Sequence, residues 1–185
     1  VVLGTTAEAA TLSNEEKKQV VDHVIKVNEG RVPLVLGIGG NNTMEVKNQI
    51  EEADLSAFSA ILSVSPYYNK PNQEGLYQHY KVLASTGKQI IIYNVPGRTG
   101  QNIEASTTLR LAKEFSNLFL IKEAAPNITQ YFDIIRQKPE GFNLVSGDDE
   151  YTLPVTLAGG NGVISVIGQA YPKEFSTMVQ LAFDG

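Results

Sequence analysis

The sequence predicts an α/β fold in which β-strands and α-helices alternate along the whole chain. Short β-branched runs recur at regular intervals, and the stretches between them carry apolar residues at helical spacing. Several of the runs are continuously apolar, as at residues 34–36, 90–92 and 118–121. Unbroken apolar strands are typical of a parallel sheet that is covered on both faces.

Seven strands are expected, each followed by a helix. The predicted strands are residues 1–4, 32–37, 60–64, 89–94, 118–122, 142–146 and 162–167. The first helix starts at Ser13, which forms a capping-box pattern with Glu16. Asn127 opens another helix in the same way. Further helices are expected at residues 43–52, 73–84, 104–115, 149–157 and 172–183.

Such a series has two main architectures, a doubly wound open sheet or a (β/α)8 barrel. A barrel needs eight units and about 250 residues, whereas this chain has 185 residues. No linker or compositional break divides the chain, so one domain is expected. Because Val1 already lies inside an apolar run, we expect the chain to be a piece of something longer.

The composition excludes several classes of protein. With 42% apolar and 19% charged residues, the chain is neither disordered nor fibrous. It has no cysteine, hence no disulfide framework or thiolate zinc site, and its two histidines, His23 and His79, make a multi-histidine metal site unexpected. A net charge of −5 argues against a general nucleic-acid binder. No signal peptide or membrane-spanning run is evident.

In α/β folds the active-site residues lie at the carboxyl ends of the parallel strands. Lys122 closes a strongly apolar run, and a partly desolvated amine there can form a Schiff base with a carbonyl. From position alone, the simpler interpretation is a lysine that reaches solvent. Tyr93 closes another apolar run and either transfers protons or packs over the end of the core.

Two loops add candidates for binding an anion. Arg98 follows Pro96 and Gly97 and can form a bidentate contact with a carboxylate. Thr5 and Thr6 follow the first predicted strand and can present hydroxyls and amides to a carboxylate at a helix N-terminus. From position alone, a surface arginine and an ordinary turn are the simpler interpretations.

Two other features are set aside. The glycine-rich segment 37–40 fits neither nucleotide-loop pattern, so we interpret it as a tight turn before a helix capped by Asn41 or Asn42. The adjacent Asp148 and Asp149 are interpreted as partners of a helix N-terminus rather than as a metal site.

Three longer motifs occur at residues 66–71 (PYYNKP), 75–80 (GLYQHY) and 93–100 (YNVPGRTG). Together with GTTAEAATL at residues 4–12 and GVISV at 162–166, they resemble the dihydrodipicolinate synthases, also called 4-hydroxy-tetrahydrodipicolinate synthases. These enzymes belong to the pyruvate-dependent class I aldolase superfamily. The motifs stand in the family's order, and the resemblance covers the whole chain.

The resemblance implies a (β/α)8 TIM barrel, of which this chain holds about seven units. The family's first strand and helix precede the residue that matches Val1, and its C-terminal helical domain follows Gly185. Residues 1–185 are therefore expected to be a single barrel domain that is incomplete at both ends. Because a barrel without its first strand has two unpaired edges, we expect this stretch alone to be unstable, and an inactive fragment or structural subunit is an alternative.

The resemblance also implies the activity. Lys122 matches the lysine that forms a Schiff base with pyruvate, whose enamine attacks L-aspartate 4-semialdehyde to give 4-hydroxy-tetrahydrodipicolinate for diaminopimelate and lysine biosynthesis. No metal or other cofactor is implied. Tyr93 and Thr5 match the proton relay, which Tyr68 completes across a dimer interface.

The remaining site residues follow from the same resemblance. Thr6 matches the residue that binds the pyruvate carboxylate, and Arg98 matches the arginine that receives the carboxylate of the semialdehyde. Gly147 and Ile164 match backbone positions that line the pyruvate pocket. N-acetylneuraminate lyases share the threonine loop and the lysine, so such a lyase or a keto-deoxy sugar acid aldolase is the alternative. The Asn-Val-Pro-Gly-Arg sequence after Tyr93 favours the synthase.

The resemblance also implies how the protein is regulated and how it assembles. Ala10, Asn41, Glu45 and Tyr67 are candidates for an allosteric site at a dimer interface, where lysine inhibits many bacterial members. Ala9, Asn14 and Lys17 stand where lysine-sensitive enterobacterial members have serine and histidines, so a weaker response to lysine is expected. The family implies a homodimer or homotetramer in the cytoplasm, with no nucleic-acid or membrane partner.

Overall fold

The computed structural model describes residues 1–185 and has an α/β fold built on one parallel sheet. The sheet contains β1 (Val35–Gly37), β2 (Ala60–Val64), β3 (Ile90–Asn94), β4 (Leu118–Glu123) and β5 (Asn143–Ser146). Each strand pairs with the next one along the chain, in the order β1-β2-β3-β4-β5. A doubly wound sheet reverses its strand order at a switch point, so this order excludes that alternative.

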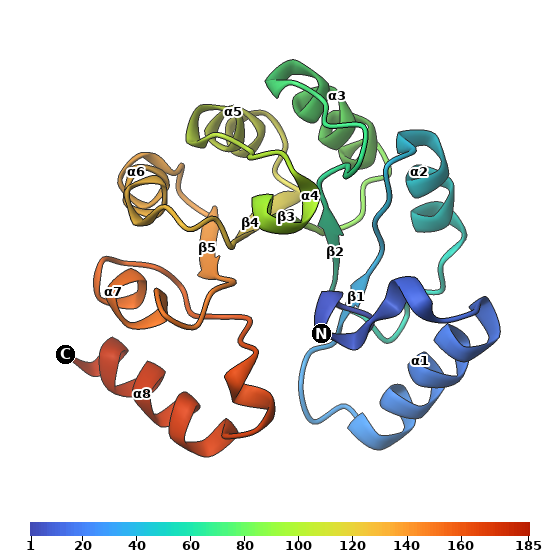
Figure 1. Cartoon of the computed structure of the whole chain (residues 1–185). Helices are drawn as coiled ribbons and strands as arrows, with labels where there is room; N and C mark the ends of the chain where they lie inside the picture. Colours follow the sequence, from blue (N-terminus) through green and yellow to red (C-terminus); the bar gives the residue numbers. More distant parts are fainter.

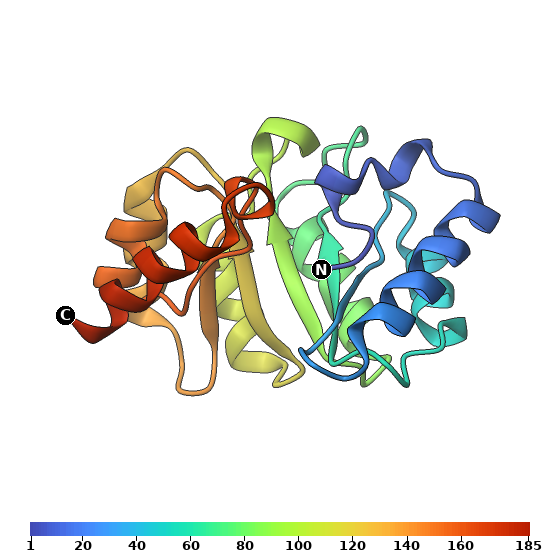
Figure 2. The ribbon, with the colours of Figure 1, turned by 90° about the horizontal axis from the view of Figure 1, so that it is seen from below.

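The helices surround the outside of the curved sheet (Figure 1). They are α1 (Asn14–Asn28), α2 (Thr43–Glu52), α3 (Gln73–Ala84), α4 (Pro96–Thr99), α5 (Ala105–Glu114), α6 (Ile128–Gln137), α7 (Thr152–Leu157) and α8 (Pro172–Asp184). Three short 3-10 helices, η1 (Thr5–Ala7), η2 (Ala9–Thr11) and η3 (Ile167–Gln169), complete the chain. Figure 2 shows α1 and α8 on opposite sides of the strands. None of the helices combines the length and apolar character needed to cross a bilayer.

The apolar strands bury both of their faces. The helix-facing side packs Ile90, Ile92 and Ile121 into the larger core cluster with side chains of the surrounding helices. The inner side holds a smaller cluster that includes Ile91 and Tyr93. Because successive residues of a strand face opposite sides, unbroken apolar runs are what a doubly covered sheet requires, as the sequence predicts.

The pairing of β3 with β4 contains one irregularity. Ile90 lies opposite Leu118, whereas Ile91 lies opposite Leu120, so Phe119 is an extra residue on β4. Phe119 and Leu120 both pack against the inner cluster although they are neighbours in sequence. A bulge of this kind changes which face the following residues occupy. It brings Lys122 opposite Tyr93.

Hydrogen bonds confirm the helix starts that were predicted from capping residues. The Ser13 hydroxyl accepts from the Glu16 amide at 3.2 Å, and the Glu16 carboxylate accepts from the Ser13 amide at 2.8 Å. The Asn127 side chain accepts from the Gln130 amide. Of the two candidates before α2, Asn42 is the cap, because its side chain accepts from the amides of the first turn.

The first predicted strand, residues 1–4, is wrong. Val2 forms only a single parallel bridge to Leu36, since Leu3 has a φ of 57°, in the left-handed region, and turns the chain out of the extended conformation. At this crossing a Cβ on Gly37 would lie 2.3 Å from the Leu3 carbonyl oxygen. Only glycine lets the two backbones come so close.

The last predicted strand, residues 162–167, is also wrong. It is reduced to one parallel bridge between Ser146 and Val163, and the chain turns into η3 at Ile167. The Asp149 carboxylate accepts from the amides of Val166 and Ile167, which favours this turn over an extended strand. The helix α7 begins at Thr152 rather than at the predicted residue 149.

Candidate active site

Lys122 and Tyr93 occupy paired positions at the ends of β4 and β3. Both side chains are buried, with exposed fractions of 8% and 5%. The Lys122 Nζ atom lies 4.2 Å from the centroid of the Tyr93 ring, an arrangement in which the ring face attracts a cationic amine. The lysine therefore does not extend freely into solvent, which was the simpler interpretation from its position alone.

Gly147, directly after β5, borders the stem of Lys122. A Cβ at this position would lie 2.7 Å from the Lys122 Cε atom and 2.8 Å from the Ala124 Cβ atom. The absence of a side chain thus leaves the space that Lys122 occupies. The Gly147 amide donates to the Glu123 carbonyl at 2.6 Å, and the Ile164 amide donates to the Ser146 carbonyl at 2.8 Å. Gly147 and Ile164 are thereby tied to the ends of β4 and β5.

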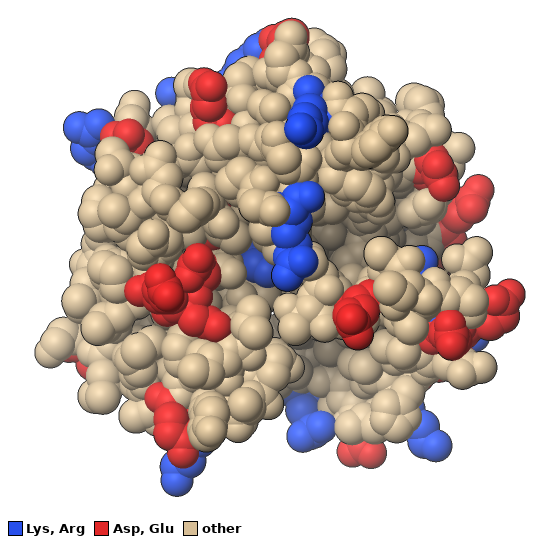
Figure 3. Space-filling model, viewed as in Figure 1, with Lys and Arg blue, Asp and Glu red and all other residues tan.

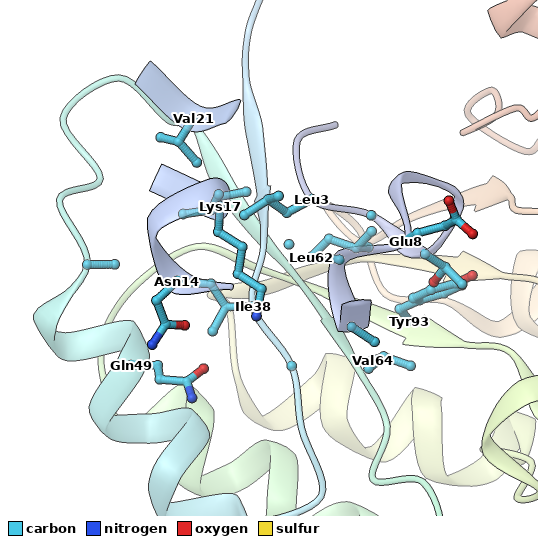
Figure 4. Close-up of a pocket in the computed structure, with 18 of the residues that line it drawn as sticks. Leu3, Glu8, Asn14, Lys17, Val21, Ile38, Gln49, Leu62, Val64 and Tyr93 are labelled. Carbon is cyan, nitrogen blue, oxygen red and sulfur yellow. The ribbon is translucent and has the colours of Figure 1, made fainter. Parts of the chain in front are cut away.

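A cavity of about 820 Å³ adjoins the inner face of the sheet and is lined by Thr5, Tyr93 and Arg98. Figure 4 shows Tyr93 and Glu8 on one side of it, and Asn14 on the other. Lys122 does not line this cavity, although its amine contacts the Tyr93 ring. The ring of Tyr93 thus links the cavity with the buried amine.

The other predicted site residues lie at the surface. Thr5 and Thr6 belong to η1, and both are exposed; Thr6 does not line the cavity. Arg98 is exposed on α4. Tyr68 has 88% of its surface exposed and a φ of 72°, a strained conformation for a bulky residue. The structure therefore unites Lys122, Tyr93 and Gly147 closely, and leaves Tyr68 apart from them.

The candidate allosteric residues divide into two groups. Ala10 and Tyr67 line the same cavity, as do Ala9, Asn14 and Lys17. Asn41 and Glu45 do not line it. The Glu45 carboxylate accepts at 3.4 Å from Gln49, which is a lining residue, and the Asn41 carbonyl accepts from the Asn69 side chain at 3.0 Å.

Figure 3 shows a few basic side chains near the centre of this face with acidic side chains on either side of them, and further side chains of both signs towards the rim. This view is that of Figure 1, in which α4, the helix of Arg98, lies at the front near the centre. The basic side chains near the centre can attract small anions. No cluster of three or more histidine or carboxylate side chains is close enough to hold a metal ion.

A buried carboxylate, to which the sequence analysis assigned no role, lies next to the site. Glu123 is fully buried, and its side chain accepts hydrogen bonds from Asn94, Gln130 and the Ala125 amide, each at 2.8 Å. Burial raises the pKa of Glu123 to about 7, against the opposing effect of these hydrogen bonds. The alternation of strand residues predicts only that Glu123 and Lys122 face opposite sides. Asn94 and Gln130 belong to other elements, β3 and α6, so their contacts with Glu123 form only in the folded chain.

The buried histidine has a local role in the structure. The His79 ring lies on α3, and its Nδ1 atom is 2.8 Å from the Thr43 hydroxyl on α2. Desolvation lowers the pKa of His79 to about 4, so the ring is neutral at physiological pH. It joins two helices and lies outside the set of residues around Lys122.

Glu123 gives the protein a predictable pH dependence of stability. Its pKa in the folded state is raised from 4.5 to about 7, so between these values the folded state retains a proton that the unfolded state has released. The free energy of unfolding should therefore fall as pH rises from about 4.5 to 7, by an amount on the order of 3 kcal/mol, and level off above that.

In Glu123→Gln this pH-dependent contribution to the free energy of unfolding should disappear. Urea denaturation of the full-length gene product at pH 5 and pH 8 measures it, and an unchanged pH dependence in the variant contradicts the assignment.

Comparisons with known proteins agree in family and in fold. The whole chain, residues 1–185, matches the model of the dihydrodipicolinate synthetase family. The 4-hydroxy-tetrahydrodipicolinate synthase of Flavobacterium psychrophilum is 60% identical over 182 residues, which are 98% of this chain and 62% of that protein. That of Parabacteroides distasonis is 56% identical over 186 residues, covering 100% of this chain and 63% of that protein.

A solved structure gives the same result. The crystal structure of dihydrodipicolinate synthase from Thermotoga maritima superposes with a TM-score of 0.95 at 38% identity, and the match covers 99% of this chain and 63% of that one. The chain thus spans less than two thirds of the length of these relatives. On the family match, the identity and the fold together, the chain belongs to the dihydrodipicolinate synthase family.

Proposed function

We propose that this chain forms the catalytic part of a 4-hydroxy-tetrahydrodipicolinate synthase, which condenses pyruvate with L-aspartate 4-semialdehyde through a Schiff base on Lys122. The observation that carries the proposal is the buried Lys122 amine, 4.2 Å from the Tyr93 ring, with Gly147 leaving space beside its stem. A desolvated amine next to a phenol supplies the nucleophile and the proton-transfer group that imine formation needs.

The same proposal extends to the fold. We infer that residues 1–185 are part of one (β/α)8 TIM-barrel domain, of which about seven units lie in this chain. The sequential parallel order of the five strands supports this. So do the isolated parallel bridges at both edges of the sheet, Val2 to Leu36 and Ser146 to Val163, because each adds a parallel contact that continues the chain order of the strands.

The reaction starts when the Lys122 amine attacks the carbonyl carbon of pyruvate. Loss of water leaves an imine, and Tyr93 with Thr5 transfers the protons that this step needs. Loss of a proton from the methyl carbon gives an enamine, which forms a carbon–carbon bond to the aldehyde of the semialdehyde. The amino group of that substrate then replaces the Lys122 nitrogen, which closes the ring and frees the lysine. The imine itself accepts the electron pair, so this redox-neutral sequence requires no metal or other cofactor.

Both substrates are carboxylates, and the basic side chains near the centre of this face suit them (Figure 3). Thr6 binds the pyruvate carboxylate, and Gly147 and Ile164 line the pyruvate pocket with backbone atoms. Arg98, which is exposed on α4 and lines the cavity, receives the carboxylate of the semialdehyde. A guanidinium group suits this role because it binds a carboxylate through two parallel hydrogen bonds.

The proposed working form is a homodimer or homotetramer in the cytoplasm. Tyr68 supports association of two copies, because 88% of its surface is exposed and its backbone is held at positive φ. In the proposal it reaches the proton relay of a second copy. One solved relative is described as a monomeric variant.

Trapping with borohydride tests the mechanism. Reduction of the full-length gene product in the presence of pyruvate should add one pyruvyl group, and peptide mass spectrometry should locate it at Lys122. Lys122→Met should remain unmodified. Absence of the adduct, or its location elsewhere, would refute the Schiff base proposed here.

The second substrate separates the synthase from the alternatives. Aspartate semialdehyde with pyruvate should give turnover, and N-acetylmannosamine or sugar aldehydes should not. The opposite result would assign the site to an N-acetylneuraminate lyase or a keto-deoxy sugar acid aldolase.

Substitution of Gly147 tests the space beside Lys122. Gly147→Ala should reduce kcat at least about tenfold, because the new methyl group displaces Lys122 from its reactive position. Gly97→Ala is a matched control, since a Cβ at Gly97 meets no atom within 4 Å although the residue lies next to Arg98. Steady-state kinetics of both variants measures the difference, and equal activities would show that Gly147 has no such role.

We also propose a weak inhibitory response to L-lysine, through a site at Ala10, Asn41, Glu45 and Tyr67. A relative from Cyanidioschyzon merolae has been solved with lysine bound. Here Ala9, Asn14 and Lys17 line the cavity, and the Lys17 ammonium repels a second cationic amine. Lys17→His should therefore strengthen inhibition in an L-lysine titration of activity. Unchanged inhibition in this variant, or strong inhibition of the parent protein, argues against this site.

A further inference from the structure

The ends of β3 and β4 carry two functional layers, one on each face of the sheet. Tyr93 pairs with Lys122, and the next residues, Asn94 and Glu123, pair with each other. Because side chains alternate along a strand, Asn94 and Glu123 lie on the helix-facing side, directly behind the Lys122–Tyr93 contact. Both are fully buried.

The Glu123 carboxylate joins three elements at this point. One oxygen accepts from Asn94 on β3 and from the Ala125 amide after β4, both at 2.8 Å. The other accepts from Gln130 on α6 at 2.8 Å and from Asn94 at 3.0 Å. Both side-chain partners, Asn94 and Gln130, donate hydrogen bonds to the Glu123 carboxylate. A carboxylate satisfies them, whereas a glutamine would turn its own amino group towards one of them.

The same hydrogen-bond network joins the two ends of the loop that carries Arg98. The Asn94 side chain accepts from the Ile103 amide at 3.0 Å and donates to the Asn102 side chain at 2.8 Å. The Asn102 side chain in turn donates to Gln130 at 2.9 Å. The segment between residues 94 and 102 thus leaves β3 and returns to the same asparagine, so its ends are fixed.

The backbone of Glu123 is held as well. Its carbonyl accepts from the Tyr131 hydroxyl at 2.7 Å and from the Gly147 amide at 2.6 Å. Side chain and backbone together therefore connect β3, β4, α6 and the end of β5 at the residue that follows Lys122.

We propose that Glu123 is a positioning residue. From the helix-facing side of the sheet, its carboxylate holds the ends of β3 and β4 and the Arg98 loop, so that the Lys122 amine stays against Tyr93 and Arg98 stays at the same site. This rests on the proposed function in one respect, that Lys122 and Tyr93 are the Schiff-base pair. Burial of a carboxylate disfavours the folded state, and the raised pKa of Glu123 reflects this, so apolar packing would serve stability alone better.

The experiment compares three variants of the full-length gene product with the parent protein. Glu123→Gln removes the negative charge and places an amino group among donors. The double variant Asn94→Asp with Glu123→Gln exchanges the amide and the carboxylate between β3 and β4. Glu114→Gln is the matched control, because the Glu114 carboxylate also binds two side chains, Tyr77 and Arg110, on helices α3 and α5.

The measurements are the rate of pyruvate trapping at Lys122 under borohydride, kcat, the two KM values and thermal unfolding. In Glu123→Gln the trapping rate should fall at least about tenfold, and the KM for the semialdehyde should rise through the Arg98 loop. The double variant should recover part of the trapping rate. Glu114→Gln should trap pyruvate at the parent rate, which separates positioning of Lys122 from the general loss of a hydrogen-bonded carboxylate.

A folded Glu123→Gln that traps pyruvate at the parent rate overturns the proposal, and so does equal slowing in Glu114→Gln. If Glu123→Gln does not fold, Glu123→Asp replaces it, because aspartate keeps the charge but shortens the reach to Gln130; a parent-like trapping rate in that variant is equally contradictory. A parent protein that forms no adduct at Lys122 refutes the proposed function instead.

Discussion

The register between β3 and β4 is the constraint on which the site depends. It sets Tyr93 opposite Lys122 and Asn94 opposite Glu123, so one pair faces inwards and the other faces the helices. The extra residue Phe119 creates this register. Without it, Lys122 would stand one place further along and opposite Asn94, and the amine would not meet the phenol.

At the ends of β3 and β4 the two faces of the sheet bury different groups. The inner face holds the Lys122 amine, and the helix-facing side holds the Glu123 carboxylate. On the inner face, the amine is shielded by an aromatic ring and has space because Gly147 lacks a side chain. On the other face, the Glu123 carboxylate is buried among donors that satisfy it. A buried charge is tolerated only when it is hydrogen-bonded in this way. The geometry of the amine therefore depends on polar contacts that lie behind it.

Parts of the fold follow from local rules. The alternation of apolar strands with helices is correctly predicted because backbone pairing and burial act at fixed periods. The caps at Ser13 and Asn127 are confirmed because their hydrogen bonds close within a few residues. The predictions of the two terminal strands are wrong because the conformation there depends on other segments of the chain. Near the first, Leu3 crosses Gly37 at close range. Near the last, the Asp149 side chain binds the amides at the start of η3.

The sequence by itself determined the fold class, the capped helix starts at Ser13 and Asn127 and, through its motifs, the family and the residues that stand at the strand ends. Only the tertiary structure decided that Lys122 is buried against Tyr93, that Gly147 borders the lysine stem and that Glu123 binds Asn94 and Gln130. The physical reason is the range of the interactions. Periodicity and capping act within one element, whereas a bulge in strand pairing and a buried hydrogen-bond network depend on segments that meet only after the chain has folded.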